Sequence, residues 1–307
     1  MAKSEQTYDL LVPLEMPKQA TFNAGRHGRM SGVNNETAFC FDAWNASFHE
    51  FGEIRYIVLR LGLPLVRLRQ LLPTIFLKIA RASVALDVSI RPVSLPLTVL
   101  SKGERADLDQ LSAIPSGGTP MAQHRSSSFQ IGLSVDLLSS ALGEGLSVDD
   151  NAGAFRLFSD VDFEATPDSK FVLLSTILEL LSERKARDNQ AQKLLDKWKA
   201  DAIGAKRQDL AQAVDLMRSQ SIGSSIFELV SEAAKAAGCE EKVAKAFSKS
   251  ARDAYRKRGK LLHAGVSVSK EELSALRSIV RLVLIGDTKG TPFTPIGNGE
   301  WEEGARF

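Results

Sequence analysis

The sequence contains little cysteine and no long uncharged apolar run, and each shortage excludes a class of protein. Its two cysteines, Cys40 and Cys239, are too few for a disulfide-stapled secreted scaffold and too far apart for a zinc site built on close cysteine pairs. Arginines and lysines interrupt even the most apolar stretch, residues 54–100, so we expect no membrane span. Residues 1–11 lack the pattern of a signal peptide. We therefore expect a cytoplasmic protein with two reduced thiols and no membrane partner.

The chain also lacks a dominant charge and an obvious set of metal ligands. A net charge of +2 over 307 residues is too small to identify a partner, and the length favours two modest domains. Three of the four histidines are scattered and make no metal set: His27, His49 and His124. We expect neither a metal nor a cofactor. The tryptophans are expected to anchor the core or the tail rather than to stack on bases: Trp44, Trp198 and Trp301.

Apolar and polar residues alternate along three segments of the first half, at 84–90, 129–135 and 155–163. Alternation over six or more residues is typical of a strand with one buried face. Residues 37–42 and 55–61 are shorter strand candidates. This half of the chain is therefore expected to be mainly β-structure, arranged as a sandwich or an open barrel.

One helix and one loop are expected to interrupt the strands. Leucines and isoleucines at helical spacing predict a helix over 64–82, although Pro73 fits poorly inside it. Residues 112–128 are rich in serine, glycine and proline, which favours a mobile loop. We expect this first domain to sense a trigger or to recruit a substrate.

The hydrophobic period changes to that of a helix after residue 165. Pro167 marks a helix start, with Thr166 or Asp168 available as its cap. Ser269 and Glu272 form a capping box in front of the last helix. Six helices are predicted, over about 168–187, 189–204, 207–219, 223–237, 239–262 and 270–285. The chain is therefore expected to be an α+β protein with three parts: a β-rich domain (1–165), an all-helical bundle (166–288) and a tail (289–307).

Arg258 and His263 are the residues that the pattern singles out for chemistry. An apolar stripe leads along one side of the predicted helix to Arg258: Val243, Phe247, Ala251 and Ala254. Burying a guanidinium without a partner is costly, so Arg258 is expected to face an anion, a carboxylate or a wet cleft. His263 follows at the end of the helix, where Gly265 lets the chain turn.

This arrangement resembles a known family. The motif is an arginine followed, after four other residues, by a histidine near the end of a late helix. It is similar to the signature of HEPN domains. The local sequence over 255–265 looks like the version found in the ApeA-type branch of bacterial anti-phage proteins. Residues 171–181, with Glu179 near their end, resemble the first helix of that branch, and residues 219–230 resemble its middle helix. The resemblance covers roughly residues 168–285.

The resemblance implies a metal-independent endoribonuclease that acts in phage defence, by abortive infection, or as a toxin. Its substrate would be RNA, with tRNA as one candidate. Histidine suits general acid–base catalysis near neutral pH, and arginine offers fixed donors for phosphate oxygens. Two HEPN domains pair in this family, so a homodimer with a composite site of Arg258 and His263 is implied. Glu179 is counted with the catalytic residues as the group that orients Arg258.

Positive charge near the motif supports an RNA partner. Four residues are candidates for binding phosphates without reading sequence: Arg252, Arg256, Lys257 and Lys260. Arg256 shares the helical face of His263 and is an alternative partner for it. The residue after the motif arginine is usually polar in the family, whereas here it is Gly259, which weakens the helix by about 1 kcal/mol relative to alanine.

Other interpretations stay open at this stage. His263 can serve as a helix-terminal cation that interacts with the last carbonyl groups, and Arg258 can form a structural ion pair with Glu179. The bundle can then be a non-catalytic HEPN module that dimerises and binds RNA or a nucleotide within a larger complex. A third alternative is a toxin silenced by an antitoxin, and a phage-derived trigger is a further candidate partner.

Overall fold

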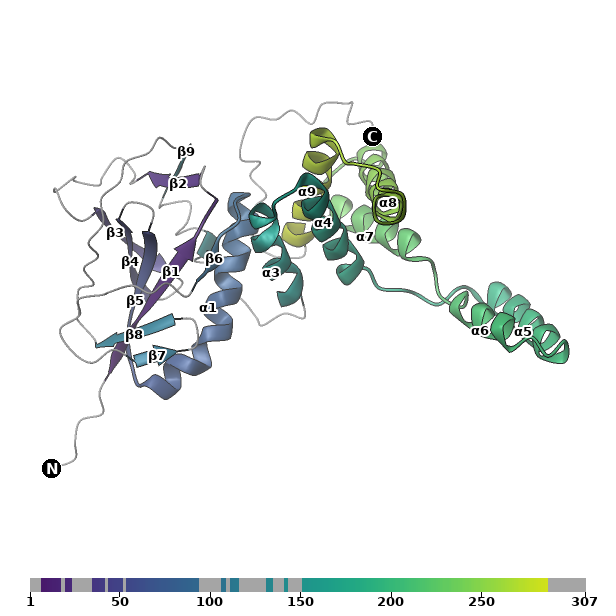
Figure 1. The fold of residues 1–307 in the computed structure, drawn as a ribbon, viewed down its shortest axis with the longest axis horizontal. Coiled ribbons are helices and arrows are strands. Elements are labelled where there is room, and N and C mark those ends of the chain that lie inside the picture. The colour runs from purple at the N-terminus through teal and green to yellow at the C-terminus, as the bar shows by residue number, and fades with distance from the viewer. Residues whose placement is uncertain are drawn as a thin grey trace. The chain divides into compact units, whose positions relative to one another are not determined.

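The structure is a computed structural model that describes residues 7–17, 20–23, 35–41, 44–51, 54–93, 106–108, 111–115, 131–134, 141–142 and 151–286. The chain divides into two compact units, Met1–Glu164 and Ala165–Phe307. The named strands all belong to the first unit, and the second unit is helical (Figure 1). The expectation of an α+β protein is confirmed. No helix among the described residues is both long and apolar enough to cross a membrane.

The main sheet of the first unit is antiparallel throughout. Its strands follow the order β3-β4-β5-β1-β8-β7, and β6 also pairs with β1. The strands are β1 (Tyr8–Glu15), β3 (Asn35–Phe41), β4 (Trp44–Phe51), β5 (Ile54–Leu63), β6 (Arg91–Pro92), β7 (Ala106–Leu108) and β8 (Leu111–Pro115). Two further strands, β2 (Ala20–Asn23) and β9 (Ile131–Ser134), form a separate parallel pair.

Three of the strand predictions are confirmed where the structure describes them. The segments 37–42, 55–61 and 129–135 fall on β3, β5 and β9, respectively. The loop predicted over 112–128 is wrong at its start, because residues up to Pro115 belong to β8 and pair with β1 and β7. The rest of that predicted loop lies outside the described residues.

The helix α1 (Leu65–Leu86) takes residues 84–86 of the segment that was predicted to be a strand at 84–90, and residues 87–90 form no strand. All residues from Leu77 to Val84 are buried, because the sheet covers one side of the helix and α3 covers another. A helix that is buried all round loses its amphipathic period, so a few alternating residues imitate a strand. Pro73 lies on an exposed part of the helix, and Asp87 ends it in the left-handed conformation (φ 53°).

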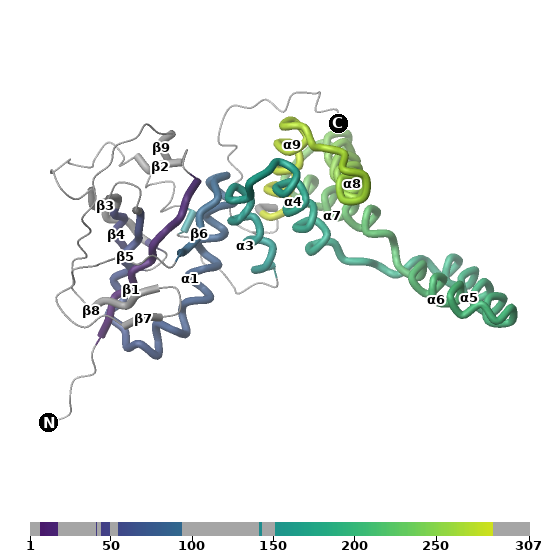
Figure 2. The backbone as a smooth tube through the Cα atoms, in the orientation of Figure 1, coloured from purple at the N-terminus to yellow at the C-terminus, as the bar shows by residue number. Residues whose placement is uncertain are grey.

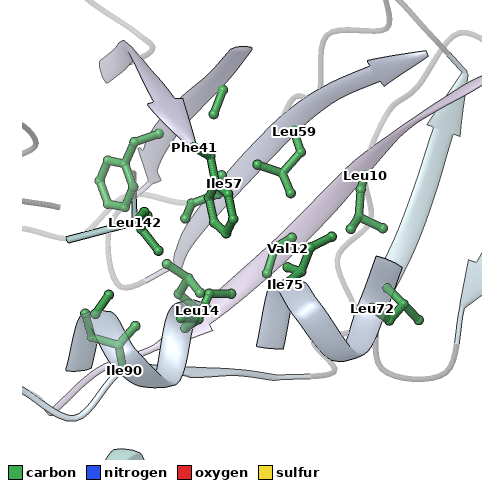
Figure 3. Close-up of a cluster of buried hydrophobic side chains, with 14 of the residues drawn as sticks. Leu10, Val12, Leu14, Phe41, Ile57, Leu59, Leu72, Ile75, Ile90 and Leu142 are labelled. Carbon is green, nitrogen blue, oxygen red and sulfur yellow. The ribbon is translucent and has the colours of Figure 1, made fainter. Parts of the chain in front are cut away.

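The core of the first unit lies between the sheet and α1. Leu72 and Ile75 of α1 pack against side chains of β1 and β5, among them Leu10, Val12 and Ile57 (Figure 3). These side chains are almost completely buried. The hydrophobic contact between the sheet and α1 therefore holds this unit together.

The strand predicted at 155–163 is also wrong. This segment forms α3 (Ala152–Asp160) and a short 3-10 helix, η1 (Val161–Phe163). Its buried residues, Ala154, Phe155, Phe158 and Val161, recur at the spacing of a helix. The guanidinium of Arg81 in α1 stacks over the Phe155 ring at 4.8 Å. The first unit therefore contains at least two helices rather than the single one expected.

Six helices make up the part of the second unit that the structure describes, residues 165–286, as predicted. They are α4 (Pro167–Leu181), α5 (Asn189–Gly204), α6 (Gln208–Leu216), α7 (Ile222–Ala236), α8 (Glu241–Ala264) and α9 (Lys270–Gly286). Thr166 caps α4 by accepting from the Ser169 N–H at 3.1 Å, whereas Asp168 accepts from the Val268 N–H at 2.9 Å. The predicted capping box of α9 is present, since Ser269 and Glu272 accept each other's backbone N–H.

The helices α4, α7, α8 and α9 pack together, and α5 and α6 form a separate antiparallel hairpin (Figure 2). The two segments that connect the hairpin to the bundle pair with each other through two backbone hydrogen bonds, Arg187 N–H to Arg218 O and Gln220 N–H to Lys185 O, each 2.9 Å long. Trp198 in α5, expected to be a core or tail anchor, is 45% exposed. The tail predicted at 289–307 lies outside the described residues.

Candidate functional site

The helix α8 buries a line of small residues against its neighbours. Ala244, Ser248, Ala251 and Ala254 are all buried, which lets α7 and α8 pack closely. The predicted apolar stripe is wrong at one point, because Val243 is 37% exposed. Arg258 follows Ala251 by seven residues, or about two turns, so it lies on the buried side as expected.

Arg258 is held by a carboxylate on α4. Its Nη1 atom lies 3.1 Å from Oε2 of Glu179, and only 23% of the Arg258 side chain is exposed. The Tyr255 hydroxyl donates to the other Glu179 oxygen at 3.5 Å, and the guanidinium carbon lies 5.7 Å from the centre of the Tyr255 ring. Burial raises the pKa of Tyr255, and the nearby Glu179 carboxylate raises it further. Tyr255 is therefore a neutral donor that helps to fix Glu179.

The guanidinium of Arg258 keeps donors that the ion pair does not use. Its Nε atom is buried and meets no acceptor among the described residues. The ion pair with Glu179 runs through Nη1, and an arginine side chain carries five N–H donors in a planar fork. Arg258 can therefore contact Glu179 and still offer donors to an anion such as a phosphate.

His263 lies in the last turn of α8 and is exposed. Gly265 ends the helix in the left-handed conformation (φ 65°). No group in the described part of the chain contributes a hydrogen bond to the imidazole. His263 follows Arg258 by five residues, which places it about 7.5 Å further along the axis and about 140° around it. One protomer therefore does not direct these two side chains to the same face of α8.

His263 instead shares a face with Arg252, Arg256 and Gly259, which precede it by eleven, seven and four residues. A Cβ atom added to Gly259 would meet nothing within 4 Å. Arg256 is exposed and pairs with Asp253 of the preceding turn at 3.3 Å. This face is thus open around Gly259 and Arg256, whereas its far end at Arg252 packs against α7.

The four predicted RNA-binding residues have different surroundings. Arg252 stacks over the Phe227 ring of α7 at 5.2 Å, and its buried Nε atom meets no acceptor among the described residues. Lys260 is exposed, as is Arg256. Lys257 bonds both carboxylate oxygens of Glu272 in α9. Its charge is therefore compensated inside the bundle, Arg256 pairs with Asp253 at the surface, and Lys260 has no ion pair within the described residues.

The sequence identified Arg258, Glu179 and His263 but assigned no role to Tyr255. Tyr255 precedes Arg258 by three residues, a spacing that places two helical side chains next to each other, so this neighbour could have been found. No cluster of three or more potential metal ligands occurs among the described residues. No family model, curated protein or solved structure matches this chain.

Proposed function

We propose that the second unit is a HEPN-type endoribonuclease that cleaves RNA without a metal, through Arg258 and His263 of two paired copies. One observation carries the proposal. An arginine on the buried side of α8 is fixed by a carboxylate of α4 and keeps free donors, while an exposed histidine stands at the end of the same helix. These groups have the chemistry needed to bind a phosphodiester and to transfer protons.

RNA supplies its own nucleophile in this reaction. The 2′-hydroxyl attacks the neighbouring phosphorus as a base removes its proton, and the bond from phosphorus to the 5′-oxygen breaks. An acid gives a proton to that 5′-oxygen, which leaves a 2′,3′-cyclic phosphate and a 5′-hydroxyl. His263 serves as base and acid, and Arg258 stabilises the charge that grows on the phosphorane oxygens.

A second copy of the chain completes this site. Two proton transfers at opposite sides of the phosphorus need two titrating groups, and one protomer supplies one His263. Within a protomer, Arg258 and His263 also lie about 140° apart around α8. In a homodimer that opposes two α8 helices, the His263 of one copy can meet the Arg258 of the other. Arg252, Arg256 and Lys260 would then contact the flanking phosphates.

Cleavage of total tRNA by the purified protein in the presence of EDTA tests the proposal. His263→Ala and Arg258→Ala should each slow cleavage by about 10²–10⁴-fold. Lys235→Ala is the matched control, because it removes an exposed cation at the end of α7, outside the proposed site, and should leave the cleavage rate within about threefold. Equal rates for the wild type and all three variants would refute the proposed site.

Two observations favour a second candidate, a non-catalytic HEPN module that binds RNA and leaves it intact. Arg258 pairs with Glu179 and lies near the Tyr255 ring. The residue after it, Gly259, has no side chain that could orient its neighbours. In this case RNA binding would weaken with salt and with Arg252→Ala or Arg256→Ala, while no cleavage would occur. Intact RNA after prolonged incubation with a protein that binds it would therefore favour the module.

A further inference from the structure

Arg184 lies on the short connector between α4 and α5, and hydrogen bonds fix the backbone on both sides of it. The Ser182 hydroxyl donates to the Glu179 carbonyl oxygen at 2.9 Å, so the connector begins directly beside Glu179. The Lys185 carbonyl oxygen accepts from the Gln220 N–H at 2.9 Å. The position of Arg184 relative to the end of α4 is therefore defined by the fold.

The side chain of Arg184 points away from the acidic residues of α7. The connector is extended where Ala186 forms a β-bridge with Ser219, and successive side chains of an extended chain point to opposite sides. The Lys185 side chain turns towards two carboxylates of α7: Glu228 at 3.4 Å and Glu232 at 3.5 Å. Arg184, the residue before Lys185, is therefore directed to the other side of the connector.

On that other side lies Tyr255 of α8. Burial raises the pKa of Tyr255, and the positive charges of Arg258 and Arg184 oppose this rise. Tyr255 also donates to Glu179, which pairs with Arg258. Two arginines, one from the connector and one from α8, thus belong to the same group of side chains, which we call the two-arginine cluster: Glu179, Arg184, Tyr255 and Arg258.

The two-arginine cluster contains one carboxylate for two guanidinium groups. Arg184 is exposed and forms no ion pair or side-chain hydrogen bond within the described residues. Its neighbour Glu183 forms none either, and alternation along the connector directs Glu183 to the side of Lys185. The Nε atom of Arg258 is buried and meets no acceptor in the same part of the chain. Donors of this kind suit the oxygens of a phosphate group.

We propose that Arg184 is a further phosphate-binding residue, which contacts the RNA backbone next to the phosphate that Arg258 binds. The identity of this ligand rests on the proposed function, whereas the contact itself comes from a segment outside α8. Glu179 keeps Arg258 in place, and Arg184 supplies the positive charge that this carboxylate leaves uncompensated by no other pair. The connector that carries the hairpin of α5 and α6 would thereby take part in binding the substrate.

Fluorescence anisotropy with the full-length protein tests this contact. The probe is a labelled 2′-O-methyl oligouridylate of about 12 nucleotides, which cannot be cleaved because its 2′-hydroxyls are blocked. Arg184→Ala should weaken binding about fivefold and should lower the salt dependence, log Kd against log salt concentration, by about 0.7, the value for one phosphate contact on a single strand. Arg184→Lys should restore most of this salt dependence, because it restores the charge.

Lys185→Ala is the matched control, because it removes the adjacent cation of the connector, which already pairs with α7. It should leave both the affinity and the salt dependence unchanged, and circular dichroism should show that every variant keeps its helices. Equal losses for Lys185→Ala and Arg184→Ala would overturn the proposal, since they would show only a general effect of charge.

Cleavage of unmodified RNA separates this inference from the nuclease proposal. Arg184→Ala should lower kcat/KM about fivefold, chiefly through KM, whereas His263→Ala should abolish cleavage. If the wild type cleaves RNA and Arg184→Ala matches it in affinity, salt dependence and KM, the inference is wrong and the nuclease proposal is unaffected. If the wild type binds the blocked RNA through Arg184 but cleaves no RNA, the nuclease proposal is wrong and the phosphate contact is supported. A wild type that binds no RNA would overturn both.

Discussion

The ion pair of Lys257 and Glu272 joins α8 to α9 and makes a measurable prediction about stability. The side chains are 23% and 15% exposed, respectively, so removal of one partner leaves a largely buried charge. Glu272→Gln keeps a side chain that can still cap the Ser269 N–H but removes the counter-charge of Lys257. We expect it to lower the free energy of unfolding at pH 7 by about 1–3 kcal/mol, which is more than an exposed pair contributes.

The pH dependence of this loss has a definite sign. Burial opposes ionisation of Glu272, but hydrogen bonds from Lys257 and from the Ser269 N–H outweigh it and lower the pKa below the ordinary 4.5. The stabilising contribution is therefore complete above 4.5 and is lost as the pH falls through the lowered pKa. The difference between wild type and Glu272→Gln should consequently shrink in acid.

Urea denaturation of both proteins at several pH values measures this difference. Glu271→Gln is the matched control, because Glu271 is the exposed neighbour of Glu272 and does not contact Lys257. It should change stability far less. A deficit for Glu272→Gln that stays constant with pH, or an equal deficit for Glu271→Gln, would refute the reasoning.

Two further predictions concern α8. Glu179→Gln should lower the free energy of unfolding by about 1 kcal/mol, and much of this cost should disappear in the Arg258→Ala background; a double-mutant cycle that shows no coupling would contradict the ion pair. Gly259→Ala should stabilise the protein by about 0.5–1 kcal/mol in thermal denaturation, because the added methyl group meets no atom. Gly265→Ala should destabilise it by about 1 kcal/mol, because Gly265 is left-handed.

The helices of the second unit could be predicted because residues close in sequence mark where they begin, by capping the first N–H groups of the helix. Thr166 and Pro167 start α4, and Asp188 accepts from the N–H groups of Gln190 and Ala191 to start α5. The predicted bounds of α5 agree with the structure. The helix predicted to reach residue 187 ends at Leu181 instead. The residues after it pair with the segment that follows α6, and a contact between distant segments cannot be predicted from the local sequence.

The first unit was harder to predict because the period of its apolar residues depends on which side chains are buried and does not by itself fix the backbone conformation. Residues 84–86 lie in α1, which is buried on several sides, whereas 155–163 lie in α3 and η1, where the alternation coincides with buried residues at helical spacing. The same limit applies to the site. The sequence offered Glu179 as a partner for Arg258, which the structure contains. The sequence also predicted that Lys257 binds RNA, whereas in the structure Lys257 bonds Glu272, fifteen residues away on α9. This contact could not be predicted, because the separate patterns of two helices do not show how the helices pack together.

The chemical ends of the RNA fragments test the proposed nuclease most directly. Purified protein is incubated with RNA in EDTA, and the fragments are analysed by mass spectrometry for their 3′ and 5′ groups. The wild type should produce 2′,3′-cyclic phosphates and 5′-hydroxyls, and His263→Ala should produce neither. Fragments with 5′-phosphates, or undiminished cleavage by His263→Ala, would contradict the assignment of His263 as the proton-transfer group.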